Sequence, residues 1–456
     1  MKERVLIGNG QGFWGDSPDT PWEMVTRGDL DYLTLDYLAE VTMSIMMRQK
    51  LRDPNRGYAT DFLTFLERAL PILMDRGIKV VTNAGGLNPI ALRGRIGEIA
   101  ERVGVFGLTV GVIEGDDILD RLPGILEEGH PLEHMDTGRP LAELRRKVLS
   151  ANAYLGAGPV AEALDQGAQI VVAGRITDTS LTLGPLMHEF GWKPGQWDLL
   201  ASGIIAGHII ECGAQATGGN FTRWWEVPDL WDIGYPIVEC RPDGTFVVTK
   251  HPGTGGLVSV DTVSEQLLYE MGRPDEYITP DVVADFTSVR LAADGPNRVL
   301  VSGITGREDT PFYKVSMTYH GGYKAVGHLT ISGPRAIEKA NLCAEIVWRR
   351  LARAGLTVSV EDRLVEIVGS DACMPGIAEA GCSPPEVVLR LGMRGNDRRK
   401  VARFGMELAP LITSGPPGIT GFAGGRPKPQ EIVAYWPALL AREVVDPGIR
   451  VSVEEV

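Results

Sequence analysis

Five short apolar runs alternate with longer amphipathic stretches along the first two hundred residues, and this alternation constrains the fold most strongly. The short runs are rich in β-branched residues, which indicates buried strands. An order of strand, helix, strand, helix predicts a parallel sheet with helices on its faces. The predicted strands span residues 4–7, 32–35, 78–82, 108–113 and 168–173. The predicted helices span residues 38–50, 58–76, 90–103, 118–128 and 158–166.

The second half of the chain has a different pattern. After a predicted helix over residues 199–212, short alternating runs such as 245–249 and 298–301 are typical of antiparallel strands. Apolar residues at helical spacing within 333–356 predict a helix that packs on them. We therefore expect an α/β fold with two domains. Residues 1–215 form a Rossmann-like parallel sheet with flanking helices, and residues 216–456 form an α+β domain with antiparallel strands.

Composition excludes several classes of partner. The chain has 45 basic and 59 acidic residues, and its net charge of -14 opposes binding to nucleic acid or to an anionic membrane surface. Its apolar runs are a few residues long, whereas a membrane-spanning helix needs about 20. The five cysteines include no C-x-x-C pair, so no disulfide framework or thiolate zinc site is indicated. A strand begins almost at residue 1, without a signal peptide, so we expect a cytoplasmic protein.

Polar or glycine-rich residues follow each of the five predicted strands. Ligands bind outside the carboxyl ends of parallel strands, in open sheets and in barrels alike, so these residues predict the position of a binding site. The residues that we expect there are Asn9, Gly12, Asp36, Asn83, Gly85, Gly86, Glu114, Arg175 and Asp178.

The segment Gly10-Gln11-Gly12-Phe13-Trp14-Gly15 matches the dinucleotide-binding pattern G-x-G-x-x-G, with Asp36 about twenty residues later. A dinucleotide loop opens directly into a helix, whereas this segment continues into Asp16-Ser17-Pro18-Asp19-Thr20-Pro21. The pair Phe13 and Trp14 would also crowd the phosphates. NAD(P) is therefore not expected, and the segment is either a loop for another ligand or a structural turn.

Carboxylates gather at two of these strand ends, where they suit acid–base chemistry or a magnesium ion. Asp36 and Glu40 are four residues apart, and Glu114 precedes Asp116 and Asp117. The alternative is helix capping, which short acidic side chains at such junctions commonly perform. We favour capping for Asp116 or Asp117. Glu114 precedes the cap position and is our first candidate for a catalytic base.

Two charged residues, Arg175 and Asp178, follow the fifth predicted strand. An arginine at this position can bind a carboxylate or a phosphate through two hydrogen bonds. Asp178 is our second candidate for the base. An ion pair between the two residues is an equally open alternative.

One predicted helix carries three candidate metal ligands. His208, Glu211 and Cys212 lie at i, i+3 and i+4, a spacing that a transition metal can use. No second cluster of histidines completes such a site. We favour a packed, hydrogen-bonded histidine, and whether the protein needs a metal stays unknown.

The segment that begins at Lys250 and His251 combines two potential cations with a glycine-rich loop. Gly253, Gly255 and Gly256 allow successive N–H groups to turn toward an anion, as in a backbone nest. A carboxylate, a phosphate or the negative end of a coenzyme would fit there. The alternative is a glycine-rich hairpin with a surface lysine.

Taken together, these motifs resemble the acyclic terpene utilisation A (AtuA-like) family from residue 5 to roughly residue 440. The resemblance implies a bacterial catabolic protein that takes part in the breakdown of citronellol- and geraniol-type terpenoids through coenzyme A thioesters. It brings no agreed reaction or catalytic residues. Related members occur with a short partner domain, which implies a small partner subunit here. The matching motifs include Gly8-Asn9, Thr82-Asn83-Ala84-Gly85-Gly86, Ala151-Asn152-Ala153-Tyr154-Leu155-Gly156, Gly174-Arg175, Gly207-His208-Ile209-Ile210-Glu211-Cys212-Gly213 and Thr249-Lys250-His251-Pro252-Gly253-Thr254-Gly255-Gly256.

We therefore expect an enzyme that acts on a branched or acyclic acid or its thioester, as a lyase (hydratase or dehydratase) or an isomerase. Coenzyme A is expected only as part of the substrate, and a homo-oligomer is expected. The alternative is a non-catalytic ligand-binding or scaffold subunit of a catabolic complex. The expected catalytic residues are Glu114, Asp178 and His251. The expected ligand-binding residues are Asn9, Gly12, Asp36, Asn83, Gly85, Gly86, Asn152, Arg175, Lys250, Gly253, Gly255 and Gly256.

Overall fold

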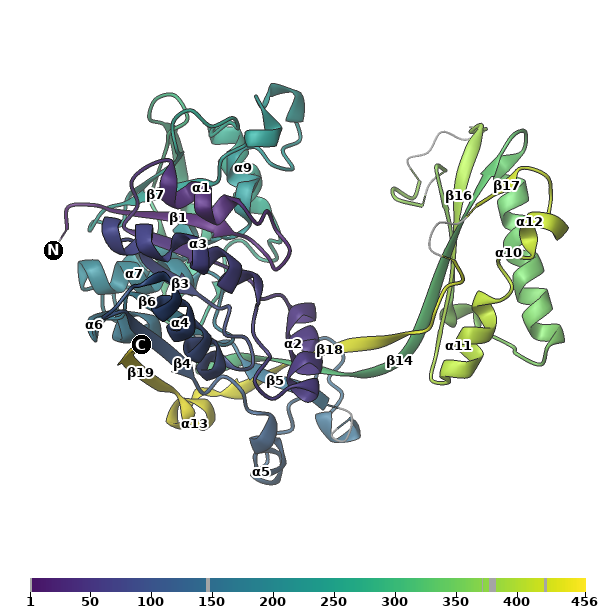
Figure 1. Ribbon diagram of the computed structural model, residues 1–456, viewed down its shortest axis with the longest axis horizontal. Helices are drawn as coiled ribbons and strands as arrows, with labels where there is room; N and C mark the ends of the chain where they lie inside the picture. Colours follow the sequence, from purple (N-terminus) through teal and green to yellow (C-terminus); the bar gives the residue numbers. More distant parts are fainter. Residues whose placement is uncertain (1, 145–147, 371, 377–382, 422–424) are drawn as a thin grey trace. The chain divides into compact units, whose positions relative to one another are not determined.

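The computed structural model describes residues 2–144, 148–370, 372–376, 383–421 and 425–456, which form two compact units (Figure 1). Unit 1 comprises Met1–Thr318 and Tyr435–Val456, and unit 2 comprises Tyr319–Ala434. The predicted domain boundary between residues 215 and 216 lies inside unit 1. Among the described residues, no helix is long and apolar enough to cross a membrane.

Unit 1 is built on a ten-stranded sheet with the strand order β11-β12-β8-β7-β1-β2-β3-β6-β4-β19. The pairs β1–β2, β2–β3, β3–β6 and β6–β4 are parallel. These five strands are the five that the sequence predicts, so the parallel sheet is confirmed. Their bounds are β1 Val5–Gln11, β2 Tyr32–Leu35, β3 Lys79–Thr82, β4 Thr109–Glu114 and β6 Ile170–Ala173.

Antiparallel strands extend this sheet on both sides. On one side β7 pairs with β1 and is followed by β8, β12 and β11, and on the other side β19 pairs with β4. These strands occupy the backbone groups that the outer parallel strands would otherwise expose. A Rossmann-like arrangement is not confirmed, because β1 borders an antiparallel strand instead of lying centrally in a parallel sheet. Their bounds are β7 Pro236–Cys240, β8 Phe246–Lys250, β11 Arg290–Ala293, β12 Val299–Ser302 and β19 Arg450–Glu455.

Helices cover both faces of the parallel strands. Leu33 and Leu35 of β2 belong to a core cluster with residues of α1, α3 and α4, which lie next to one another in Figure 1. Tyr32 points to the opposite face, where its hydroxyl donates a hydrogen bond to Glu189 of α7. The helices of unit 1 are α1 Thr20–Thr26, α2 Glu40–Arg52, α3 Asp61–Arg76, α4 Pro89–Val103, α5 Leu122–Glu127, α6 Gly158–Asp165, α7 Ser180–Phe190, α8 Trp197–Glu211, α9 Val260–Leu268 and α13 Arg442–Val445.

Shorter elements complete unit 1. A three-stranded sheet has the order β13-β10-β9, and β5 pairs with the long strand β14, whose first residues belong to unit 1 and whose later residues belong to unit 2. The bounds of these strands are β5 Val148–Ala153, β9 Tyr277–Ile278, β10 Val283–Asp285, β13 Thr305–Arg307 and β14 Phe312–Ser332. The 3-10 helices of this unit are η1 Leu119–Arg121, η2 Leu141–Glu143, η4 Gly213–Thr217, η5 Trp224–Glu226, η6 Leu230–Asp232, η7 Phe286–Ser288 and η9 Asp446–Gly448.

Unit 2 is an antiparallel sheet with helices packed on it, as the sequence predicts for the second half. The strand order is β15-β16-β14-β17, and β18 also pairs with β14. Cys343 and Val347 of α10 share a core with Leu389 and Leu391 of β16. The bounds are α10 Ala336–Arg353, η8 Val360–Asp362, β15 Arg363–Val368, β16 Glu386–Gly395, α11 Arg398–Gly405, α12 Leu411–Ser414, β17 Ile419–Thr420 and β18 Gln430–Ala441.

The burial of β2 makes a direct prediction for stability. Leu33→Ala should lower the free energy of unfolding by about 2–5 kcal/mol, because it leaves a cavity at a fully buried position. Urea unfolding followed by circular dichroism measures this loss. Leu51→Ala is the matched control, since Leu51 is 72% exposed and should change little. Equal unfolding midpoints for the two variants would contradict the position of Leu33 in the core.

Candidate active site

A cavity of about 600 Å³ lies at the carboxyl ends of β1, β2 and β6. Four of the expected site residues line it: Gly12, Asp36, Arg175 and Asp178. We call it the acidic cavity, because its lining side chains include five carboxylates together with Arg175. The other lining residues are Phe13, Asp16, Leu38, Ala39, Glu211, Cys212, Ala214, Gln215, Gly219, Asn220, Tyr235, Tyr269 and Glu270.

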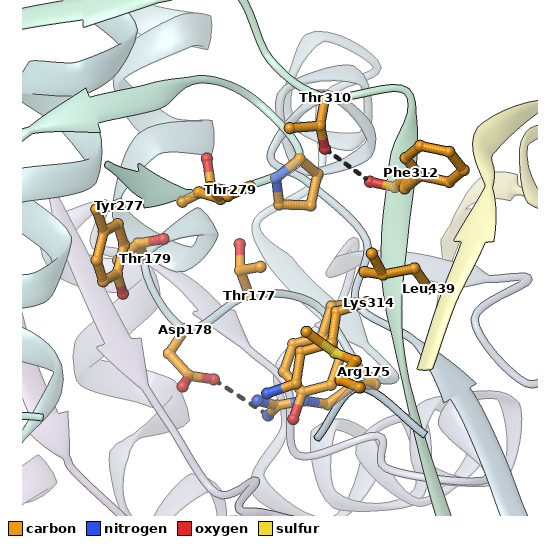
Figure 2. A pocket seen from close by; sticks show the side chains of 14 residues that line it. Arg175, Thr177, Asp178, Thr179, Tyr277, Thr279, Thr310, Phe312, Lys314 and Leu439 are labelled. Carbon is orange, nitrogen blue, oxygen red and sulfur yellow. Dashed lines mark hydrogen bonds and ion pairs between the residues drawn. The ribbon is translucent and has the colours of Figure 1, made fainter. Parts of the chain in front are cut away.

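A second cavity, of about 420 Å³, shares Arg175 and Asp178 with the first. We call it the apolar cavity, because aromatic and aliphatic side chains form much of its wall (Figure 2). Arg175 and Lys314 both lie against the ring of Tyr154, with charged groups 4.0 and 5.0 Å from its centre. The other lining residues are Met135, Thr177, Thr179, Tyr277, Ile278, Thr279, Pro280, Thr310, Phe312 and Leu439.

Arg175 is held in place from several directions. Its guanidinium donates to the backbone oxygen of Leu38 at 2.9 Å and pairs with Asp178 at 3.1 Å, the contact drawn in Figure 2. Its backbone N–H donates to Asp116 at 2.8 Å. Only 3% of the residue is exposed. These contacts fix the position of a cation on the wall between the two cavities. The ion pair of Arg175 with Asp178, which the sequence left as an open alternative, is present.

Asp116 supports the loop that carries Arg175. One of its carboxylate oxygens accepts hydrogen bonds from the Arg175 N–H and from the Asn152 side chain, both at 2.8 Å. Gly174 is required beside it, because a Cβ atom there would collide with the carboxylate. Burial raises the pKa of Asp116 to about 7. Asp117 accepts a hydrogen bond from the Leu119 N–H, and it lies one residue before Ile118, the N-cap of η1.

Asp36 is a buried carboxyl group on the wall of the acidic cavity. It accepts hydrogen bonds from the Leu38 N–H at 3.0 Å and from the Asn83 side chain at 2.6 Å. Burial and the nearby charge of Asp178 hold the pKa of Asp36 well above its usual range, and Arg175 opposes that rise. The protonated acid is therefore favoured at Asp36 to a higher pH than for an exposed aspartate.

Several predicted ligand residues serve the architecture of the site instead of lining a cavity. The Asn9 side chain donates to the backbone oxygen of Ile210, which ties β1 to the end of α8. Gly85 lies against Ala173, and Gly86 lies against Met46, so a side chain at either glycine would collide with its neighbour. The side chains of Asn83 and Asn152 donate hydrogen bonds to Asp36 and Asp116, respectively. None of these five predicted residues, Asn9, Asn83, Gly85, Gly86 and Asn152, lines either cavity.

The structure of residues 250–256, which we call the Lys250 loop, contradicts one interpretation of the sequence. The N–H groups of Gly255 and Gly256 donate to backbone oxygens of Asp232 and Pro228, so they are not available to an anion. The anion nest predicted at these two glycines is therefore wrong. The loop closes against the backbone of residues 228–233, which leaves no room for a side chain at either glycine.

The side chains of this loop are also engaged within the protein. Lys250 donates to Thr254, and the ring of His251 donates to the backbone oxygen of Met24 at 2.9 Å. Burial lowers the pKa of His251. Lys250, His251 and Gly253 line neither of the two cavities, so their roles in binding and catalysis stay predictions.

Glu114 ends β4 opposite Arg450 of β19 and is half-buried. It lines neither cavity, and its role as the base stays a prediction. Asp178, the second candidate, lines both.

Metal binding finds no support in the part of the chain that the structure describes, where no group of three or more His, Cys, Asp and Glu side chains is placed to hold an ion. The favoured interpretation of His208 is confirmed. Its two ring nitrogens lie 3.1 Å from the carboxylate of Glu211 and 3.1 Å from the backbone oxygen of Gln266.

Sequence reasoning missed Tyr154, Tyr277 and Lys314 as cavity residues. Tyr154 lies within the motif of residues 151–156, which contributes to the family resemblance but gives no local sign that its tyrosine faces a cavity. Tyr277 and Lys314 belong to short or alternating strands of the second half, where local pattern gives no sign of which side chains face a cavity.

One comparison with known proteins gives a match. The family model described as acyclic terpene utilisation family protein AtuA matches residues 5–451, which is nearly the whole chain. No curated protein and no solved structure matches the chain.

The burial of Asp116 predicts a pH dependence of stability. Because its pKa is raised to about 7 in the folded protein, its contribution to stability is complete below the unfolded value of about 3.9. As the pH rises above about 3.9, that contribution falls by roughly 1.4 kcal/mol for each pH unit, and it is lost once the pH has risen through 7. Urea unfolding at pH 4.5 to 8 should show a steeper loss for the wild type than for Asp116→Asn. Parallel curves for the two proteins would contradict a titrating Asp116.

Proposed function

The chain belongs to the acyclic terpene utilisation family AtuA, and on that premise we propose that it is an enzyme acting on a branched or acyclic acid or its coenzyme A thioester. Membership implies a part in acyclic terpene utilisation. The step that we propose is a hydration, a dehydration or an isomerisation, in which a proton moves at a carbon atom near the carbonyl group.

The apolar cavity suits the hydrocarbon part of such a substrate. Its volume of about 420 Å³ lies within the range of roughly 300–1,000 Å³ that small-molecule sites occupy. Phe312, Ile278 and Leu439 offer apolar contacts to a branched chain. Arg175 and Lys314 supply the positive charge that a carboxylate or a thioester oxygen needs. The substrate is therefore proposed to place its acyl chain here, with its oxygen toward the two cations.

Asp178 is the proposed base. It lies beside Arg175 on the wall of this cavity, and that single observation supports the proposal most directly. Removal of a proton next to a carbonyl group places negative charge on the carbonyl oxygen. Arg175 and Lys314 would stabilise this charge because fixed cations in a partly apolar cavity interact strongly with it. Asp178 would also return the proton, because among the described residues that line the apolar cavity it is the one with a carboxyl group.

The expected partners remain part of the proposal. A small partner subunit follows only from the earlier resemblance, and a homo-oligomer is a general expectation for an enzyme of this kind. Neither is needed to form the two cavities, whose lining residues all belong to unit 1.

Deuterium exchange tests the proposed reaction. We expect the wild-type protein in D₂O to place deuterium into geranoyl-CoA or citronelloyl-CoA, or into the free acids, as measured by mass spectrometry. Asp178→Asn should slow this exchange by about 100-fold or more, because it removes the base. The same compounds should still raise the melting temperature of the variant. Asp75→Asn, which changes an exposed carboxylate outside both cavities, is the matched control.

The outcomes separate an enzyme from a carrier. Stabilisation by these compounds without any exchange in the wild type would favour the non-catalytic binding subunit. Exchange that Asp178→Asn leaves unchanged would remove Asp178 from the reaction. Neither stabilisation nor exchange with any of the compounds would reject this substrate class.

A further inference from the structure

Thr177 places a hydroxyl group on the wall of the apolar cavity (Figure 2). It lies between β6 and α7, directly before Asp178, the proposed base. Two backbone hydrogen bonds hold it there. Its N–H donates to the backbone oxygen of Leu155, and its own backbone oxygen accepts from the Ser180 N–H, both at 2.9 Å. The backbone therefore fixes where the Thr177 side chain lies.

The Thr177 hydroxyl group contacts a second hydroxyl group that does not line the cavity. Its Oγ1 atom lies 2.5 Å from Oγ of Ser180, a fully buried residue. Oγ of Ser180 lies in turn 3.4 Å from Oδ2 of Asp281. Neither Ser180 nor Asp281 lines either cavity. The three side chains thus form a series of hydrogen bonds that runs from the cavity to a carboxyl group behind its wall.

Asp281 ends this series as a hydrogen-bond acceptor. The Ala157 N–H, which precedes α6, lies 2.9 and 3.1 Å from its two carboxylate oxygens. Gly156 is required beside it, because a Cβ atom there would collide with the carboxylate. Burial raises the pKa of Asp281 to about 6, and hydrogen bonding and the charge of Arg442 oppose that rise. At neutral pH the group is therefore mainly a carboxylate, which only accepts hydrogen bonds.

The carboxylate sets the direction of the other hydrogen bonds. A hydroxyl group has one hydrogen to donate and two lone pairs that accept. Ser180 gives its hydrogen to Asp281, so it accepts from Thr177. Thr177 has then given its own hydrogen to Ser180, and it offers only a lone pair of Oγ1 to the cavity. A group that binds at Thr177 must therefore supply the hydrogen itself.

We propose that Thr177 accepts a hydrogen bond from the hydroxyl group of a hydroxyacyl substrate, and so selects hydration or dehydration among the reactions considered above. This inference rests on the proposed function. A hydroxyl group at the reacting carbon supplies the hydrogen that Thr177 needs. A carbonyl oxygen only accepts, so it is directed instead to Arg175 and Lys314. An isomerisation involves no hydroxyl group and would leave Thr177 without a role.

The selected reaction balances with Asp178 as its single acid and base. In dehydration, the C–H bond next to the carbonyl group breaks and an O–H bond forms at Asp178. The electron pair of that C–H bond forms the double bond, and the bond between carbon and the hydroxyl oxygen breaks. The proton of Asp178 passes to the departing oxygen, which leaves as water. The products are an unsaturated thioester and water, and Asp178 is restored.

Thioesters that differ by one hydroxyl group test the proposed contact. They are citronelloyl-CoA and its 3-hydroxy derivative, which forms when water adds to the conjugated double bond of geranoyl-CoA. Affinities are measured by isothermal titration calorimetry in Asp178→Asn, which does not consume the ligands. We expect the hydroxy derivative to bind about tenfold more tightly, because it gains one hydrogen bond in a partly apolar cavity. The 3-methoxy derivative, which accepts but does not donate, should gain no affinity.

Variants of Thr177 locate this preference. Adding Thr177→Val removes the hydroxyl group at nearly constant shape and should abolish the preference, whereas Thr177→Ser keeps the hydroxyl group and should retain it. Thr249→Val is the matched control, because the Thr249 hydroxyl group donates to a backbone oxygen outside both cavities. Tight binding of the methoxy derivative, or a preference that survives Thr177→Val, would overturn the proposed contact.

Two rates separate this inference from its premise. One is addition of water to geranoyl-CoA, followed by loss of the ultraviolet absorbance of the conjugated double bond. The other is deuterium exchange next to the carbonyl group of citronelloyl-CoA in D₂O, followed by mass spectrometry. Only the first reaction uses a hydroxyl group, so Thr177→Val should lower water addition about tenfold more than it lowers exchange.

The outcomes of the rate measurements are distinct. A wild type that exchanges deuterium without adding water, or an equal effect of Thr177→Val on both rates, would overturn the role of Thr177 and keep the proposed function. Neither exchange nor water addition in the wild type would overturn both. If Thr177→Val does not fold, as judged by circular dichroism, Thr177→Ala decides by the same comparisons.

Discussion

The parallel pairing of β1, β2, β3, β6 and β4 is the constraint on which the site depends. Parallel strands end at the same edge of a sheet, so residues from positions 12, 36 and 175 meet although the sequence separates them widely. The pairing also explains why glycine follows these strands. Gly12 and Gly174 let the strand ends lie against α8 and against Asp116, where any side chain would collide.

Buried charge couples the residues of this edge to one another. Asp36, Asp116 and Arg175 are each less than 5% exposed, and an isolated charge at such a position is strongly unfavourable. The hydrogen bonds from Asn83, Asn152 and the backbone offset that cost. Loss of one of these partners leaves a buried polar group without its hydrogen bond, which costs about 1–3 kcal/mol and more where the group is charged. The architecture of the site and its electrostatics therefore cannot be changed independently.

The sequence predicts the parallel strands because they are buried on both faces and so consist of continuous apolar runs. It also predicts Asp36, Arg175 and Asp178, since position after a strand is a local property. It does not predict that β7, β8 and β19 join the same sheet, because pairing between distant segments leaves no periodic signal. Likewise the glycines at 255 and 256 signal a crowded backbone without showing that Asp232 and Pro228 fill the space.

The charge difference between the two cavities bears on how a thioester would enter. Five carboxylates line the acidic cavity, and the phosphates of coenzyme A would be repelled by them. Lys314 lines only the apolar cavity, so the anionic part of a thioester would meet attraction on that side. Arg175 and Asp178 line both cavities, so they lie between the region that suits an acyl chain and the region that repels the anionic end of the thioester. The acyl chain and the anionic end of a thioester would therefore both lie on the Lys314 side of Arg175 and Asp178.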